Sequence, residues 1–208
     1  MISKMKKWNE VLWCCKSNIR GVYYYHGKGI TMNIEFDADE SKAIQVIGVL
    51  TARCRDSFDY YLAMKVVYAL ERTALIRWGQ PVIGGNYRML PYGPVNQFVM
   101  DVINVNRRGF FSECFDRCGD EIRLKKDPGT GELSRAEIKL IEQVCDEWKH
   151  LSFEQARVKA HSFPECAELE GLVVGISPER ILQAAGKKPE QIAELAAENA
   201  FLLRLKRQ

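Results

Sequence analysis

The stretch KVVYALERTALIRWGQPVIGGNYRMLPYGPVNQFVMDV, residues 65–102, decides the fold of this chain. Its first part carries apolar residues around most of a helical circumference, which is typical of a helix buried on all sides. Gly79 stands where such a helix needs a left-handed cap, and Pro81 prevents its continuation. We therefore predict a central helix over residues 58–78, around which the rest of the chain packs.

The second part of this stretch predicts a turn and then another helix. Glycines at 84–85 open a turn that leads into an alternating, aromatic-containing run over residues 86–90. The sequence Tyr-Gly-Pro-Val follows at 92–95, where glycine permits an unusual backbone dihedral and proline suits a first helical turn. We therefore predict a helix over residues 94–106.

Capping residues and apolar spacing predict further helices on both sides of the central stretch. They are expected from Asp37 or Asp39 to about Cys54, over a short piece within 110–118, from the Ser134/Glu137 capping box to Lys149, from Ser152, from Ser177 ahead of Pro178, and from Pro189 to the C-terminus. Residues 121–125 alternate ahead of a strong turn signal and predict a strand, with 86–90 as its candidate partner. The expected fold is thus mainly α-helical: a compact helical domain with a small antiparallel β element, an N-terminal arm and a C-terminal helix.

Length and charge indicate how the chain is divided. Its 208 residues suit one domain with extensions. The formal net charge is +3, but residues 1–31 alone hold six basic residues and one acidic residue, which gives +5 there and −2 for the remainder. We therefore divide the chain into a basic N-terminal arm or upstream extension (1–31), a domain (32–186) and a C-terminal helix (187–208), with Met32 as a candidate native start. The basic excess is therefore local, and a solvated arm is favoured over a tail that binds nucleic acid or an acidic partner.

Cysteine usage and hydropathy indicate the compartment. Seven cysteines at irregular positions are an odd number without the framework of a small secreted protein, which favours reduced thiols in the cytoplasm. No window offers the roughly 18 uncharged apolar residues of a membrane span, so no membrane partner is expected.

Motifs that would indicate catalysis are missing from the sequence. It has neither a Walker loop nor a dinucleotide-binding fingerprint. Cys145, His150, His161 and Cys166 combine two thiols with two imidazoles, but their spacing differs from the tight cysteine pairs of structural zinc sites. Cys145 fits the apolar face of its helix, and His161 fits a cap or a core hydrogen-bond donor. We expect no metal, no cofactor and no enzymatic activity, and an enzyme that uses this Cys/His set is kept as an alternative.

The ordered motifs of the chain resemble the Panacea domain, the antitoxin SocA-like family. The resemblance spans about residues 36–186 and lies mainly in the helix 65–72 and the segment 81–95. The positions that match the family pattern are Lys65, Tyr68, Pro81, Gly84, Tyr87, Tyr92, Gly93, Pro94 and Val95, followed downstream by His161 and Pro164. Cys166 departs from the pattern, because relatives usually place a tryptophan shortly after the downstream proline.

This resemblance implies an antitoxin of a toxin–antitoxin pair, of the kind often encoded beside its toxin and in prophage. Such proteins neutralise a cognate protein toxin by direct contact, and some of those toxins are tRNA-modifying enzymes that resemble alarmone synthetases. One family member implies an alternative, a proteolytic adaptor that delivers a partner to an ATP-dependent protease. Both readings make the chain a binding protein.

The residues around the Tyr-Gly-Pro turn are the candidates for contact with such a partner. Tyrosine and arginine are enriched among the residues that dominate interface energies. We therefore select Arg88, Tyr92, Asn96 and Gln97 as partner-binding candidates. The C-terminal helix from Pro189 is the second candidate surface.

Overall fold

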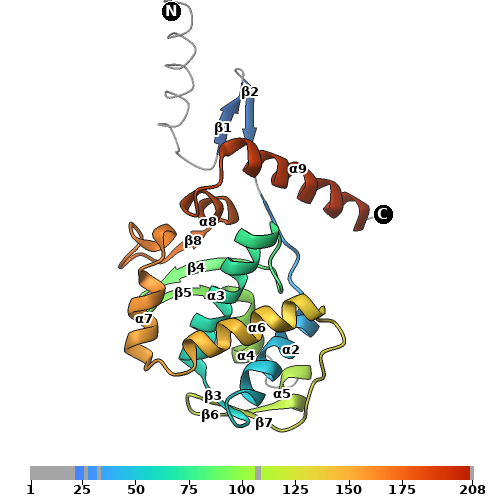
Figure 1. Cartoon of the computed structure of the whole chain (residues 1–208), viewed down its shortest axis with the longest axis vertical. Coiled ribbons are helices and arrows are strands. Elements are labelled where there is room, and N and C mark those ends of the chain that lie inside the picture. The colour runs from blue at the N-terminus through green and yellow to red at the C-terminus, as the bar shows by residue number, and fades with distance from the viewer. Residues whose placement is uncertain (1–21, 26–27, 32–33, 106–108, 207–208) are drawn as a thin grey trace, which may run out of the picture. The chain divides into compact units, whose positions relative to one another are not determined.

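The protein is described by a computed structural model that covers residues 22–25, 28–31, 34–105 and 109–206. These residues belong to two compact units (Figure 1). One unit combines the chain up to residue 35 with residues 188–208, and the other comprises 36–187. Most of the predicted basic arm and the candidate start at Met32 lie outside the described residues.

The first unit contains a hairpin and the C-terminal helix. Strand β1 (Val22–Tyr25) pairs antiparallel with β2 (Lys28–Thr31). Helix α9 (Pro189–Lys206) begins at the predicted proline and ends in cations, which suit the partial negative charge at a helix C-terminus.

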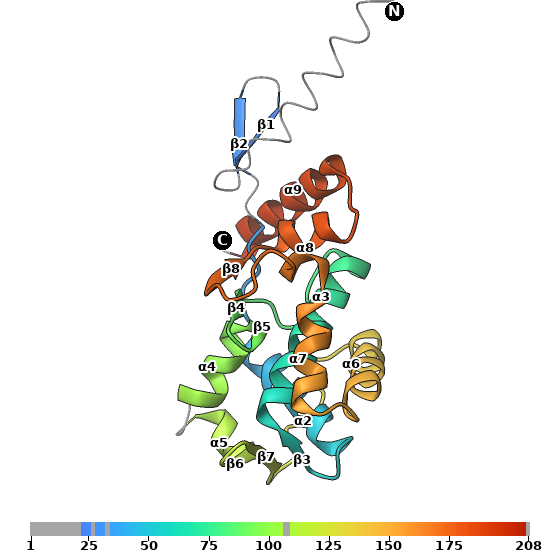
Figure 2. The same cartoon turned by 90° about the vertical axis from the view of Figure 1, so that its left-hand side faces the viewer.

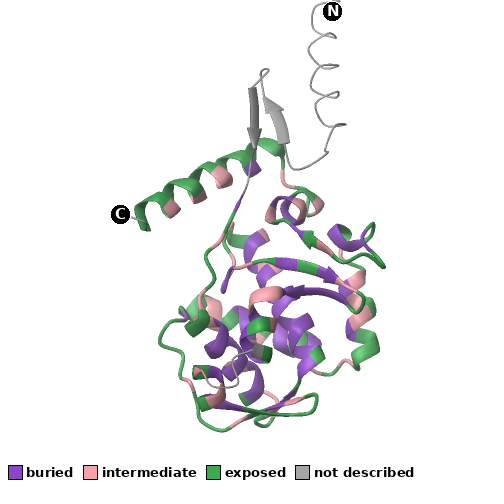
Figure 3. Ribbon diagram, turned by 180° about the vertical axis from the view of Figure 1, so that it is seen from behind, coloured by how far each residue is buried: buried purple, intermediate pink, exposed green. Residues whose placement is uncertain are grey.

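The second unit is built around the central helix α3 (Tyr60–Trp78), as the sequence predicts. Helices α2 (Glu40–Ala52), α6 (Arg135–Trp148) and α7 (Phe153–His161) lie around it (Figures 1 and 2). The shorter helices are α4 (Gln97–Val105), α5 (Phe110–Cys114), η1 (Pro164–Cys166) and α8 (Pro178–Ala184). Every residue of α3 from Leu62 to Glu71 is buried, and the helices packed around α3 turn their buried faces toward it (Figure 3). The predicted mainly α-helical fold with small antiparallel sheets is confirmed.

Local signals explain where α3 begins and ends. The Asp59 side chain accepts a hydrogen bond from the backbone N–H of Leu62, and Gly79 closes the helix in the left-handed region at φ 75°. The predicted start at Phe58 is wrong by two residues. Phe58 instead belongs to strand β3 (Ser57–Asp59), where it pairs with Ile122 and both side chains are buried.

One three-stranded sheet carries the sequence motif, in the order β5-β4-β8. Strand β4 (Tyr87–Leu90) lies in the middle, between β5 (Gly93–Asn96) and β8 (Val174–Ile176). The predicted helix over 94–106 is therefore wrong in its first residues, because Pro94 lies in β5 opposite Met89. Proline is tolerated there because β5 is an edge strand.

A second sheet joins residues far apart in the sequence, in the order β3-β7-β6. Strand β7 (Glu121–Leu124) pairs with β3 and with β6 (Phe115–Cys118). The predicted pairing of this strand with residues 86–90 is wrong. The short helix predicted within 110–118 ends at Cys114, and its remainder is β6.

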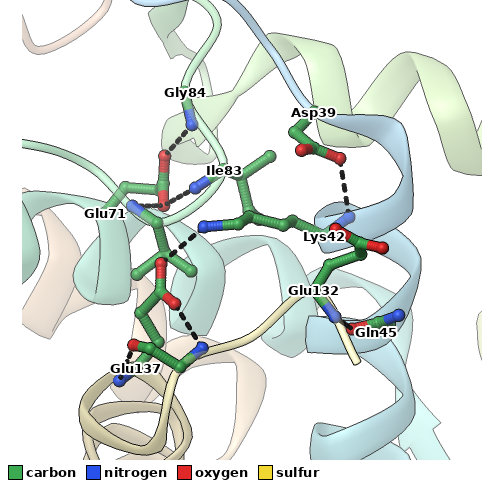
Figure 4. A network of polar contacts seen from close by, with 10 residues as sticks. Asp39, Lys42, Gln45, Glu71, Ile83, Gly84, Glu132 and Glu137 are labelled. Carbon is green, nitrogen blue, oxygen red and sulfur yellow. Dashed lines mark hydrogen bonds and ion pairs between the residues drawn. The ribbon is translucent and has the colours of Figure 1, made fainter. Parts of the chain in front are cut away.

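The predicted caps of the later helices are confirmed, and polar contacts tie α6 to α2. Ser134 and Glu137 form the capping box of α6, Ser152 caps α7, and Ser177 caps α8. Glu137 also binds Lys42 of α2 at 2.7 Å (Figure 4). None of the helices in the described part of the chain has the length and apolarity needed to cross a membrane.

Candidate protein-binding site

Four polar residues on α3 organise the Tyr-Gly-Pro hairpin and the segments behind it. Lys65, Tyr68, Glu71 and Arg72 follow one another at helical spacing, so their side chains share one side of the helix. Together they hold three segments of the chain and so fix the surface described below.

Glu71 fixes the turn that leads into the hairpin. Its carboxylate is fully buried and accepts backbone N–H bonds from Ile83 at 2.9 Å and Gly84 at 2.8 Å (Figure 4). It also accepts from the Val82 N–H at 3.0 Å and from the Tyr87 hydroxyl at 3.2 Å. Burial raises the pKa of Glu71 to about 7, against the opposite effect of these four donors. Gly84 has φ 83°, and a Cβ there would collide with the carbonyl oxygen of Asp37. Gly84 and Tyr87, two residues of the sequence motif, thus donate hydrogen bonds to the buried carboxylate of Glu71.

Arg72 and Tyr68 anchor the segment that follows α7. Arg72 binds both carboxylate oxygens of Glu165, at 2.6 and 3.2 Å, and the Tyr68 hydroxyl donates to the same carboxylate at 3.1 Å. Glu165 is only 1% exposed, so this bidentate pair is shielded from solvent. The guanidinium of Arg72 also lies 4.5 Å from the centre of the Phe163 ring. These contacts clamp η1 onto the central helix.

Lys65 and His161 meet the hairpin at its turn. The Lys65 ammonium donates to the carbonyl of Pro94 at 3.1 Å, and burial lowers the pKa of Lys65 to about 8. His161 lies against Gly93, and burial lowers its pKa as well. Neither ring nitrogen of His161 has a hydrogen-bond partner among the described residues, so its predicted role as a cap or core donor is wrong. His161 acts by packing against the glycine of the motif.

We expect Gly93→Ala to destabilise the fold by about 2–4 kcal/mol, because φ is 98° and a Cβ would lie 3.1 Å from two His161 ring atoms. Gly129→Ala is the matched control, since Gly129 also has positive φ, 73°, but nothing within 4 Å of its added Cβ. Urea denaturation of both variants measures the difference. Equal losses would show that His161 does not restrict this position.

The hairpin turn and two helix starts display three exposed rings, of which the one in the middle contacts the other two. Tyr92 in the β4–β5 turn is 59% exposed, and its ring lies edge-on to Phe153 at the start of α7, with 5.8 Å between centroids. Phe153 in turn lies 5.5 Å from Tyr61 at the start of α3, and both are 37% exposed. We call Tyr61, Tyr92 and Phe153 the aromatic patch. Adjoining exposed rings of this kind mark protein interaction sites.

The four predicted contact residues have different environments. Arg88 is exposed on the middle strand β4, and Tyr92 belongs to the aromatic patch. Gln97 is half-buried and donates to Asp101 at 2.8 Å. Asn96 is fully buried, because its amide donates to the Gly84 carbonyl at 2.8 Å and accepts from the Val99 N–H at 3.1 Å. The prediction that Asn96 contacts a partner is therefore wrong, since this residue caps α4 from inside the fold.

The cysteines and histidines that suggested an enzyme are not gathered into one site. Cys145 lies buried in α6 and Cys166 in η1, whereas His150 is exposed after α6 and His161 packs on Gly93. Within the described ranges, no cluster of three or more His, Cys, Asp or Glu side chains has an arrangement that could hold a metal ion.

Comparison with known proteins identifies the family of this chain. No curated protein and no solved structure matches the chain significantly. The antitoxin SocA-like, Panacea-domain family matches residues 63–166, which is half of the 208 residues. The match begins within α3 and ends in η1, so it includes the helix, the hairpin and the Glu165 clamp that build the surface described above. The chain belongs to the antitoxin SocA-like, Panacea-domain family.

Proposed function

We propose that this protein is an antitoxin that neutralises a protein toxin by binding it directly through the aromatic patch. The observation that carries this proposal is the contact between Tyr61, Tyr92 and Phe153, three exposed rings brought together from three elements. Membership of an antitoxin family supports a toxin as the partner.

The geometry of the aromatic patch suits a binding surface. Aromatic side chains bury a large area for few rotatable bonds, so little conformational entropy is lost on association. The edge-on contacts hold the rings before a partner arrives. Tyr92 lies two residues before Pro94, and the carbonyl of Pro94 accepts a hydrogen bond from the buried Lys65 of α3. This bond fixes the turn that carries Tyr92. The patch is therefore preorganised.

The buried polar groups of α3 and η1 support binding over catalysis. Glu71 and Glu165 are saturated by internal donors, and the ammonium of Lys65 is bound to a backbone carbonyl. Each of these groups is engaged in holding a segment of the fold. We further propose that the protein works in the cytoplasm, in keeping with the five described cysteines, which are all free thiols.

The test is a double variant, Tyr92→Ala with Phe153→Ala, co-expressed with the toxin encoded beside it. Removing two interface anchors costs about 2 kcal/mol or more of binding, roughly a 30-fold weaker complex. We expect growth rescue to fail and the dissociation constant measured by calorimetry to rise accordingly. The melting temperature should change by only a few degrees, because both side chains are exposed.

Val158→Ala is the matched control, since Val158 is 57% exposed on the same helix as Phe153 and should leave rescue intact. A double variant that still binds the toxin with normal affinity would move the contact to Arg88 or to α9. Folded Cys145→Ser, Cys166→Ser and His161→Gln variants should keep rescue, and its loss would favour the enzyme. Disappearance of the toxin through a cellular protease would favour the adaptor.

A further inference from the structure

A basic pocket lies where the end of α2 meets the end of α6. It is open, has a volume of about 310 Å³, and is lined by Arg53, Cys54, Arg55, Lys149 and His150. The pocket thus places one cysteine among three cationic side chains and an imidazole. The proposed binding surface at the hairpin does not involve these residues.

The thiol in this pocket has a second thiol behind it. Cys54 is partly exposed, and its side chain is within hydrogen-bonding reach of Cys145, which is fully buried in α6. Ion pairs hold the junction, because Arg53 binds Glu142 at 3.1 Å and Asp146 at 2.5 Å, and these two residues flank Cys145 in α6. The two sulfurs are therefore held as neighbours by contacts on both sides.

The charge of the pocket is incompletely neutralised. Asp146 binds both Arg53 and Lys149, whereas Arg55 has no ion pair within the described residues. Arg55 has φ 60° and Asp56 has φ 64°, in the left-handed region that non-glycine residues seldom occupy. Strained backbone of this kind clusters at functional sites. It places an unpaired guanidinium directly after the accessible thiol.

We propose that Cys54 is a thiol–disulfide exchange site for an anionic low-molecular-weight disulfide of the glutathione type, with Cys145 as the resolving thiol. The Cys54 thiol gives its proton to water, and the thiolate attacks one sulfur of the disulfide, whose S–S bond breaks to release one thiolate. Cys145, deprotonated in the same way, attacks the Cys54 sulfur and expels the second thiolate. The protein loses two electrons and two protons, and the small disulfide becomes two thiols.

The environment makes the two thiols slow to react with reagents that carry no charge. Burial raises the pKa of Cys54, and burial with the neighbouring Cys54 raises the pKa of Cys145 to about 12. Both thiols are thus mostly protonated and poor nucleophiles at neutral pH. The cations around Cys54 oppose this by attracting the anionic reagent and by stabilising the thiolate. We therefore expect Cys54 to react faster with anionic disulfides than with neutral ones.

The experiment exposes the full-length protein to glutathione disulfide, blocks the remaining thiols with an alkylating reagent and maps the peptides by mass spectrometry. We expect wild type to end with a Cys54–Cys145 disulfide and Cys145→Ser to stop at a mixed disulfide on Cys54. Cys118, an exposed thiol, is the internal control and should form only a mixed disulfide. Labelling of Cys118 with Cys54 untouched would overturn the proposal, as would a Cys54 adduct that wild type never resolves.

The role of charge has its own test. Arg55→Gln should slow the reaction with glutathione disulfide about three- to tenfold and leave the reaction with neutral hydroxyethyl disulfide unchanged. The difference should vanish near 1 M salt, where the screening length is about 3 Å. Equal slowing with both reagents would overturn the anionic specificity.

Oxidation also has a thermal readout. The disulfide joins positions 54 and 145, which are 91 residues apart, so it should raise the melting temperature by about 5 °C or more, reversibly with dithiothreitol. Cys145→Ser should show no such rise, and an unchanged melting temperature in oxidised wild type would contradict the internal bond.

Discussion

Alanine in place of Glu71 is expected to lower the free energy of unfolding by about 3–6 kcal/mol, because three backbone N–H groups lose their acceptor in a buried place and each costs about 1–3 kcal/mol. Those groups belong to Val82, Ile83 and Gly84, at 2.8–3.0 Å from the carboxylate. Urea denaturation followed by circular dichroism measures the loss as a lower midpoint at an unchanged slope. A loss below about 1 kcal/mol would show that water replaces the carboxylate.

Glu71→Gln is the graded control and reports on protonation. Its amide oxygen keeps one pair of donors, but its NH₂ group faces the Gly84 N–H, so an intermediate loss is expected. The carboxyl titrates near 4.5 when unfolded and at about 7 when folded, so between these values the folded state binds more protons. Wild-type stability due to Glu71 is therefore full below pH 4.5 and is lost as the pH rises through 7. The glutamine variant should lack this fall, and identical pH profiles would contradict the raised pKa.

Leu70→Asp is expected to prevent stable folding. Leu70 is 0% exposed at the centre of α3, and an unpaired buried charge costs several kcal/mol, about as much as the whole stability of a small domain. Circular dichroism should show loss of helix and no cooperative melting. Arg77→Asp on the exposed side of the same helix is the matched control, since Arg77 makes one surface bond to Gln143, and it should cost less than about 1 kcal/mol. A normal melting curve for Leu70→Asp would contradict the central position of α3.

The parts of the fold that could be predicted are those fixed within a few residues of sequence. The caps Asp59, Ser134 and Ser152 act on backbone groups three residues away, and the left-handed Gly79 ends its helix locally. Strand partners could not be predicted, because a strand of three or four residues specifies no partner by itself. The pairing of β3 with β7 depends on Phe58 and Ile122, which lie far apart in the chain.

The candidate site was only partly predictable for the same reason. Tyr92 follows from the motif, but its contact with Phe153 arises from the packing of α7 on the hairpin, and the contact of Phe153 with Tyr61 arises from the packing of α7 on α3. The signal for Tyr61 and Phe153 is that each comes one or two positions after an N-cap residue, in the first turn of its helix. Asn96 is polar and close to a turn, but the sequence alone does not show that its side-chain amide makes two hydrogen bonds inside the fold.

The Glu165 clamp also orders events during synthesis. Tyr68 and Arg72 precede Glu165 by 97 and 93 residues, so at about 5–20 residues per second the ribosome completes the clamp roughly 5–20 s after it has made the central helix. Strand β8, the third strand of the hairpin's sheet, is made later still. During that interval Tyr68 and Arg72 have no carboxylate partner, because Glu165 has not yet been synthesised. Chains that end before residue 165 therefore lack the carboxylate that closes this junction.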